Sequence, residues 1–150
     1  MLRTRLSEAL KDSLRAKNER LTGTVRLIMS ALKDRDIAAR PKGITAIPDD
    51  EILQMMNSMI KQRRESIEMF QKGNRPELAQ QEQEEIYIIL SFMPKQMDDA
   101  EVAAAVKDAV AQTGAASVKD MGKVMAVLKE KYAGRMDFSR VSGAVKQVLG

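Results

Sequence analysis

The sequence predicts an all-α protein, with an N-terminal four-helix subdomain and a C-terminal three-helix bundle. Apolar residues recur at spacings of three and four along most of the chain, which is the period of amphipathic helices. Glycines and prolines interrupt this pattern at a few places, and no segment alternates apolar and polar residues as a strand does. We therefore expect two domains, residues 1–93 and 98–150, joined by the short hinge PKQM.

Two helices are expected before the first break in the pattern. Leucines at every fourth position from Leu2 to Leu14 predict a helix over about 2–16. A second apolar stripe predicts a helix over about 19–39. The stretch ARPKGITAIPDD then interrupts the pattern with two prolines and a glycine. The residues expected to face inward from these helices are Leu2, Leu6, Leu10, Leu14, Leu21, Val25, Ile28, Met29, Leu32 and Ile37.

A second pair of helices follows this break. Asp49 and Asp50 suit a helix start, because carboxylates accept from the free N–H groups there and favour the positive end of the helix dipole. Gly73 ends this helix, over about 50–72, and Pro76 suits the first turn of the next, over about 76–92. The residues expected inward are Ile52, Met56, Met59, Ile60, Ile67, Phe70, Leu78, Ile86, Ile89, Leu90 and Met93.

Three short helices are expected in the C-terminal part. Asp98 and Glu101 have capping-box spacing, and Ser117 and Asp120 repeat it at the next helix start. Asp137 suits the cap of the last helix. These signals predict helices over about 98–113, 117–132 and 138–149, with Gly134 closing the second.

The composition limits the chemistry that the chain can perform. Hydrophobic residues at 44% and charged residues at 31% are typical of a soluble globular domain, and 11 methionines fill core space in place of aromatic residues, which make up only 3%. The chain has no cysteine and no histidine, which excludes thiolate chemistry and removes the commonest general base and metal ligand. We expect no catalytic residue, no metal ligand and no cofactor.

No apolar run approaches the ~20 residues of a membrane-spanning helix, so no membrane partner is expected. The first residues are amphipathic and carry Glu8 and Asp12, unlike the apolar segment of a signal peptide. With no export signal, we expect a cytoplasmic location.

Positive charge gathers near the C-terminus. Residues 1–93 hold 16 basic and 14 acidic side chains, a near balance, whereas residues 117–150 hold seven basic and three acidic ones. Lys119 and Lys123 are four apart, and Lys129, Lys131 and Arg135 are expected to crowd the turn around Gly134, within reach of Arg140. Such a rim suits the phosphates of a folded RNA, although an ordinary solvated face has the same charge. The candidate RNA-binding residues are Lys119, Gly122, Lys123, Lys129, Lys131, Arg135 and Arg140.

Gly122 is expected in the middle of a helix, where glycine costs about 1 kcal/mol relative to alanine. This cost indicates the close approach of a neighbouring helix, the more ordinary reading, or of a ligand backbone. Tyr132 is the one aromatic residue among the charges, with Phe138 expected in the core. Single-strand readers offer several stacking rings, so this region favours recognition of shape and phosphate.

Several segments together carry a family resemblance. The stretch "DMGKVMAVLKEKYAGRMD", followed by "VSGAVKQVL", is similar to the C-terminal signature of the GatB/YqeY family. The resemblance continues through "KQRRES" (61–66), "AQQEQEEI" (79–86) and "SFMPKQM" (91–97), so it covers nearly the whole chain. It implies a small helical protein whose C-terminal module resembles the tail of the B subunit of the glutamine-dependent tRNA amidotransferase.

In that enzyme the tail contacts the tRNA elbow, while the chemistry occurs in a separate catalytic domain that nothing here resembles. The resemblance therefore implies RNA contacts at Gly122–Met125 and at the turn Lys131–Asp137, with Val124, Met125 and Leu128 expected in the core. A carbon–nitrogen ligase activity with glutamine as amide donor would be inherited by homology alone.

Other polar groups have simpler interpretations. Arg63 falls on an apolar stripe, and because an unpaired buried charge is costly, we expect it to pair with Glu82 or Glu85. The acidic run Glu82, Glu84 and Glu85 has no further ligand nearby in sequence, which favours solvated carboxylates over a metal site.

Three functions follow from these observations. The leading hypothesis is a non-catalytic protein that binds tRNA or similarly folded RNA. The second is a protein adaptor that uses its methionine-bearing helices or the groove between modules, with an exposed apolar patch as its discriminator. The third, ranked lowest, is an amide-transfer enzyme or an accessory to a glutamine-dependent carbon–nitrogen ligase, which would need an activated nucleophile.

Overall fold

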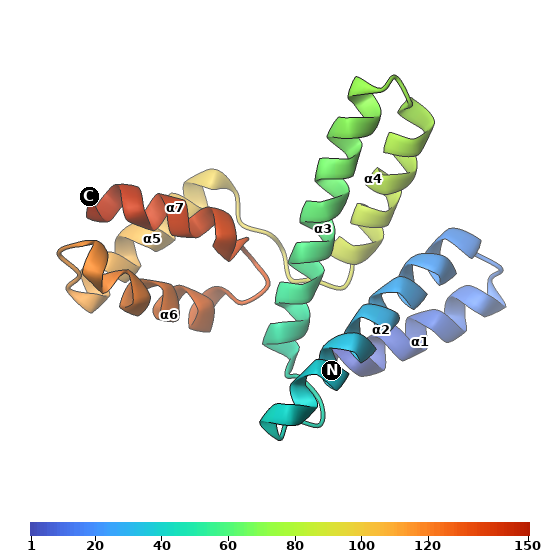
Figure 1. The fold of residues 1–150 in the computed structure, drawn as a ribbon, viewed down its shortest axis with the longest axis horizontal. Helices are drawn as coiled ribbons and strands as arrows, with labels where there is room; N and C mark the ends of the chain where they lie inside the picture. Colours follow the sequence, from blue (N-terminus) through green and yellow to red (C-terminus); the bar gives the residue numbers. More distant parts are fainter. The chain divides into compact units, whose positions relative to one another are not determined.

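The computed structural model describes all residues from 1 to 150, and it confirms the all-α fold (Figure 1). It contains seven α-helices, two short 3₁₀ helices and no strand. No helix combines the length and apolar character needed to cross a membrane. The elements in chain order are α1 (Leu2–Arg15), α2 (Glu19–Ala39), η1 (Arg40–Lys42), α3 (Asp49–Lys72), α4 (Pro76–Leu90), α5 (Asp99–Thr113), η2 (Val118–Asp120), α6 (Met121–Tyr132) and α7 (Phe138–Leu149).

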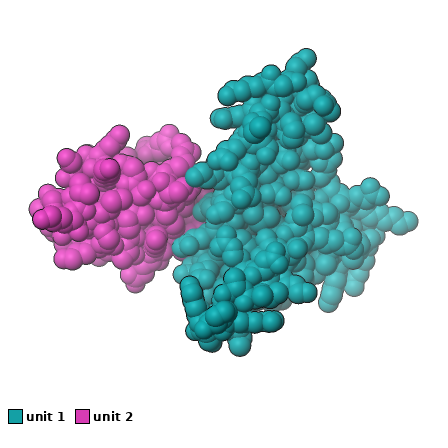
Figure 2. Space-filling model, viewed as in Figure 1, with its two compact units in different colours: residues 1–93 teal, residues 94–150 magenta.

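The chain divides into two compact units, residues 1–93 and 94–150, coloured separately in Figure 2. Each unit has its own hydrophobic cluster. In the first unit the cluster draws on α1 to α4, with Leu6, Ile28, Ile52 and Met56 fully buried. In the second unit it includes Val124, Leu128 and Val145. Each unit therefore contains the apolar contacts that its own helices need to pack.

Two helical hairpins form the first unit. α1 packs against α2, α3 packs against α4, and α2 contacts α4 (Figure 1). The boundaries lie close to those expected, because the start and stop signals are strong. Pro76 occupies the first turn of α4, and the turn before it is made by Asn74, whose φ is 56°. The segment Arg40–Lys42, expected as irregular, forms a 3₁₀ turn closed by Gly43 in the left-handed conformation.

Two apolar positions expected inward are exposed. Leu14 is 49% exposed and Ile37 is 44% exposed, although the other inward positions of α1 and α2 are buried or partly buried. Both lie toward an end of their helix, Leu14 near the end of α1 and Ile37 near the end of α2. The period of a helix gives the direction of a side chain, but a neighbour must be present along the whole length for it to be buried.

Arg63 confirms the ion pair expected from the sequence. Its Nε donates to Glu85 Oε2 at 2.9 Å and lies 4.0 Å from Glu82 Oε2, while its Nη1 donates to the carbonyl of Met59. Burial, followed by the negative charge of Glu85, raises the pKa of Glu82. Glu84 pairs with Arg20 at 3.4 Å. All three carboxylates of the acidic run are therefore near an arginine.

Three helices that contact one another form the second unit. Asp98 caps α5 by accepting from the N–H of Glu101 at 2.8 Å, and Asp137 caps α7 by accepting from the N–H of Ser139 at 3.0 Å. The expected cap by Ser117 is wrong, since its side chain accepts no capping bond. Asp120 Oδ2 instead accepts from the N–H of Ala116, the residue before Ser117, at 3.1 Å.

Candidate nucleic-acid interface

The buried residues of α6 determine which of its other residues face solvent. Val124 and Leu128 are completely buried in the core of the second unit. Helical spacing places Gly122 and Lys129 on the side of α6 opposite these two residues, and both are exposed. Met125 is partly buried and packs against the same core. Of the segment Gly122–Met125, the first two residues therefore face solvent and the last two face inward.

Gly122 differs from expectation in its place within the helix and in its surroundings. It is the second residue of α6 and not a mid-helix residue, because η2 occupies the chain just before it. A methyl group built on its Cα would meet no side chain and no other helix within 4 Å. Packing of a neighbouring helix, the more ordinary interpretation of this glycine, is therefore wrong, and the surface beside it is open.

Four of the predicted cations are exposed and have no partner in the protein. Their side chains make no hydrogen bond or ion pair with any other residue, so their charged donors are available to a ligand. Lys119 lies in η2, so its four-residue spacing from Lys123 is not the spacing of one continuous α-helix as expected. The four residues are Lys119, Lys123, Lys129 and Arg140.

Lys131 and Arg135 do not crowd one place as expected. Lys131 Nζ donates to Gln112 Oε1 at 2.7 Å, whereas Arg135 Nη2 lies 3.8 Å from Glu101 Oε2. These two acceptors are eleven positions apart on α5, which corresponds to about 16 Å along the helix axis. The two cations therefore point toward opposite ends of α5, because that helix offers acceptors at both.

Arg135 is also occupied by contacts within the second unit. Its Nε donates to the carbonyl of Lys95 at 3.1 Å, and its guanidinium lies over the ring of Tyr132, 5.9 Å from the centroid. Its own carbonyl accepts from the N–H of Met97 at 2.9 Å, and Gln96 donates to the carbonyl of Gly134. Arg135 thus holds the segment 94–97, expected as a hinge, against the α6–α7 turn. This role depends on tertiary structure and could not be predicted from the charge of the residue.

Two exposed residues of α7 are absent from the candidates predicted from the sequence. Gly143 lies in the middle of α7, is exposed, and has no side chain or other helix within 4 Å of where a methyl group would be. Lys146 is exposed and unpaired. Helical spacing places both opposite the buried Val141 and Val145. An exposed glycine within a helix pattern was the signal that could have identified this face.

Comparison with known proteins gives relatives from yeasts. The chain is 32% identical over 88 residues to "Altered inheritance of mitochondria protein 41, mitochondrial" of Lachancea thermotolerans, covering 59% of this chain and 46% of that protein. It is 32% identical over 84 residues to the protein of the same name from Saccharomyces cerevisiae, covering 56% and 44%. An uncharacterized protein of Schizosaccharomyces pombe is 24% identical over 90 residues, covering 60% and 70%.

The chain thus spans less than half the length of the first of these relatives, and none of the three names is that of an enzyme. Their names correct the expected cytoplasmic location, because the relatives from Lachancea and Saccharomyces are mitochondrial proteins by name. That expectation rested on the lack of an export signal, which does not distinguish the cytoplasm from an organelle inside the cell.

A wider match covers nearly the whole chain. The family described as "Yqey-like protein" matches residues 3–149, which cover nearly all of both compact units and all seven α-helices except the first residue of α1. This match confirms the family suggested by the sequence motifs. The chain belongs to the YqeY-like family.

Proposed function

We propose that this protein is a non-catalytic RNA-binding protein whose C-terminal unit contacts the backbone of tRNA or a similarly folded RNA. The contacts come from the outward faces of η2, α6 and α7. The residues that make them are the unpaired cations Lys119, Lys123, Lys129, Arg140 and Lys146, together with the open surface at Gly122 and Gly143.

The observation that carries this proposal is a set of exposed cations that the protein itself leaves without partners. Elsewhere in this unit, Lys131 and Arg135 are held by Gln112, Glu101 and a carbonyl group. Cations that stay unpaired can replace the counterions around phosphates, which is the main source of affinity for nucleic acids.

The two exposed glycines support the same faces. Glycine in a helix interior costs about 1 kcal/mol relative to alanine, which applies to Gly143 in the middle of α7 and less to Gly122 in the first turn of α6. Neither glycine is required by a packed neighbour. A ligand backbone that approaches the helix closely would explain why a side chain is missing at both places. This argument applies to a helix surface and needs no base-specific contact.

The aromatic residues favour a folded RNA over a single strand. Tyr132 is partly buried beneath the guanidinium of Arg135, and Phe138 packs against the core of the unit. Neither ring is free to stack on an unpaired base, whereas proteins that bind single strands present several such rings. Recognition by shape and phosphate fits the groups that remain.

The proposal of a non-catalytic role rests on how the reactive groups are used. Ser139 donates its hydroxyl to Asp137 at 2.7 Å, and Ser142 donates to a backbone carbonyl. The chain lacks histidine and cysteine, and the carboxylates of its acidic run lie beside Arg20 and Arg63. An amide-transfer enzyme would need an activated nucleophile, and these contacts supply none.

Fluorescence anisotropy of deacylated tRNA tests the proposal across a series of salt concentrations. We expect binding that weakens steeply with salt, and the substitutions Lys123→Gln and Lys129→Gln each to reduce the slope by about one. Lys61→Gln, an exposed lysine on α3, is the matched control and should leave the slope unchanged. Binding without salt dependence, or equal effects of all three substitutions, would refute the assignment of this surface.

A further inference from the structure

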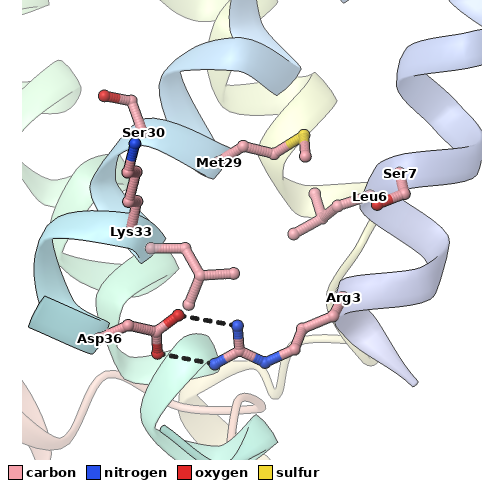
Figure 3. Close-up of a pocket in the computed structure, with 8 residues that line it drawn as sticks. Arg3, Leu6, Ser7, Met29, Ser30, Lys33 and Asp36 are labelled. Carbon is pink, nitrogen blue, oxygen red and sulfur yellow. Dashed lines mark hydrogen bonds and ion pairs between the residues drawn. The ribbon is translucent and has the colours of Figure 1, made fainter. Parts of the chain in front are cut away.

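A groove of about 490 Å³ lies between α1 and α2 in the N-terminal unit (Figure 3). It is separate from the surface proposed to bind RNA and does not depend on that proposal. Its volume falls within the range of small-molecule sites. The residues that line it are Arg3, Leu6, Ser7, Met29, Ser30, Leu32, Lys33 and Asp36.

The floor of the groove is apolar. Leu6 is fully buried and Leu32 nearly so, and Met29 is partly buried beside them. Figure 3 shows the side chains of Leu6 and Met29 directed into the space between the two helices. A ligand that covers this floor would remove apolar surface from water, which favours a ligand with an apolar body.

Several polar groups around this floor have hydrogen-bond donors without a partner in the protein. The hydroxyls of Ser7 and Ser30 and the ammonium of Lys33 have no hydrogen-bond partner or ion pair in the protein, and all three residues are exposed. The other serines within the α-helices donate their hydroxyls to carbonyls or to a carboxylate. Ser30 and Lys33 lie together on α2, across the groove from Ser7 (Figure 3). The free hydroxyl and ammonium on α2 suit a ligand that offers anionic oxygens.

An ion pair between Arg3 and Asp36 lies at one end of the groove. Arg3 donates to both oxygens of Asp36, at 2.9 and 2.8 Å, and also to the carbonyl of Ile47 at 3.0 Å. The N–H of Ile47 donates to Asp36 at 2.9 Å. These bonds lower the pKa of Asp36 to about 2, with Arg3 as the largest cause. Asp36 is therefore balanced by Arg3, and the charge of Lys33 remains in excess.

The surrounding hairpin strengthens this preference. Residues 1–42 hold eleven basic and five acidic side chains, whereas residues 43–93 hold five basic and nine acidic ones, so the near balance of the unit conceals a positive half. Arg26 and Lys33 of α2, and Arg40 directly after this helix, recur every seven residues and have no ion pair. A positive field over an apolar groove favours anions on approach.

We propose that this groove binds a small anionic amphiphile, a carboxylate or phosphate attached to a short apolar chain. The anionic head lies against Lys33 and Ser30 on α2, and the apolar chain covers Leu6, Met29 and Leu32. A free anion lacks the group that covers the floor, and a neutral or cationic amphiphile lacks the group that pairs with Lys33.

Two-dimensional ¹H–¹⁵N NMR of the full chain tests this with four probes below their micelle concentrations. Octanoate and octyl phosphate should give saturable shifts in α1 and α2. Acetate and octyltrimethylammonium should bind at least ten-fold more weakly. Whichever of the two anionic probes binds more tightly identifies the head group as a carboxylate or a phosphate.

Substitutions complete the test. Lys33→Gln should weaken octanoate binding by about five- to ten-fold, since a hydrogen bond to a charged group is lost at an exposed site. Lys42→Gln, an exposed cation outside the groove, should leave it unchanged. Three results would overturn the proposal: the cationic probe binds as tightly as octanoate, the shifts map away from this groove, or Lys33→Gln leaves the affinity for octanoate unchanged. The proposal would also be overturned if tRNA shifted the NMR signals of these residues and octanoate did not, because the groove would then be a nucleic-acid surface.

Discussion

Replacing Gly143 by alanine should separate stability from binding. Gly143 is exposed in the middle of α7, and the added methyl group would meet no side chain or other helix within 4 Å. The substitution therefore gains helix propensity without strain, worth about 1 kcal/mol. Because the unit spans residues 94–150, this gain corresponds to a rise in Tm of roughly 4–8 °C if the unit unfolds by itself.

The same change should weaken tRNA binding several-fold if an RNA backbone approaches α7 closely. Thermal unfolding followed by circular dichroism and tRNA anisotropy measure the two effects on one sample. Ala126→Gly, the reverse change at an exposed position of α6, serves as the control and should lower stability by about 1 kcal/mol. A more stable Gly143→Ala variant with unchanged affinity would refute the argument that the exposed glycines make room for a ligand.

Three further substitutions test the structural interactions. Asp36→Asn should cost about 2 kcal/mol, because Arg3 loses its charged partner, and should flatten the pH dependence. The pKa of Asp36 in the folded protein, about 2, lies below its value in the unfolded chain. The native protein therefore loses this part of its stability as the pH falls from about 4 toward 2. Urea unfolding at several pH values measures the loss. Gly134→Ala should lower the free energy of unfolding by about 1–2 kcal/mol, since φ is 75° there, and a smaller loss in urea unfolding would contradict this. Arg63→Ala should cost about 3 kcal/mol in the same assay by leaving Glu85 partly buried without its partner, and a cost below 1 kcal/mol would show that the pair is not needed.

Most helices could be predicted from the sequence because several independent signals agree at most boundaries, the start of α6 being the exception. Asp98, Pro76 and Asp137 mark helix starts by local chemistry, and the structure places them as expected. The 3₁₀ turns η1 and η2 were missed, since they depend on a few hydrogen bonds that periodicity does not encode. Ile37 was expected inward because its spacing fits, but burial also requires a neighbour.

The candidate sites depend more strongly on tertiary structure. The positive charge of residues 117–150 was evident from the sequence, but the partners that occupy Lys131 and Arg135 come from α5 and from the segment before it. The groove between α1 and α2 combines Ser7 with Ser30 and Lys33 from another helix, so no local motif marks it. The uneven charge within residues 1–93 was the one sequence signal that could have drawn attention to that hairpin.

The proposed RNA surface is tested most directly by comparing two charge-neutralised proteins for binding to deacylated tRNA. One carries glutamine at Lys119, Lys123, Lys129 and Arg140, and the other carries glutamine at four exposed cations of the N-terminal unit, Lys11, Lys17, Lys42 and Lys61. We predict that the first protein loses most of its affinity at physiological salt, while the second keeps most of its own. Equal losses in the two proteins would show attraction by overall charge, and would contradict a defined surface on the C-terminal unit.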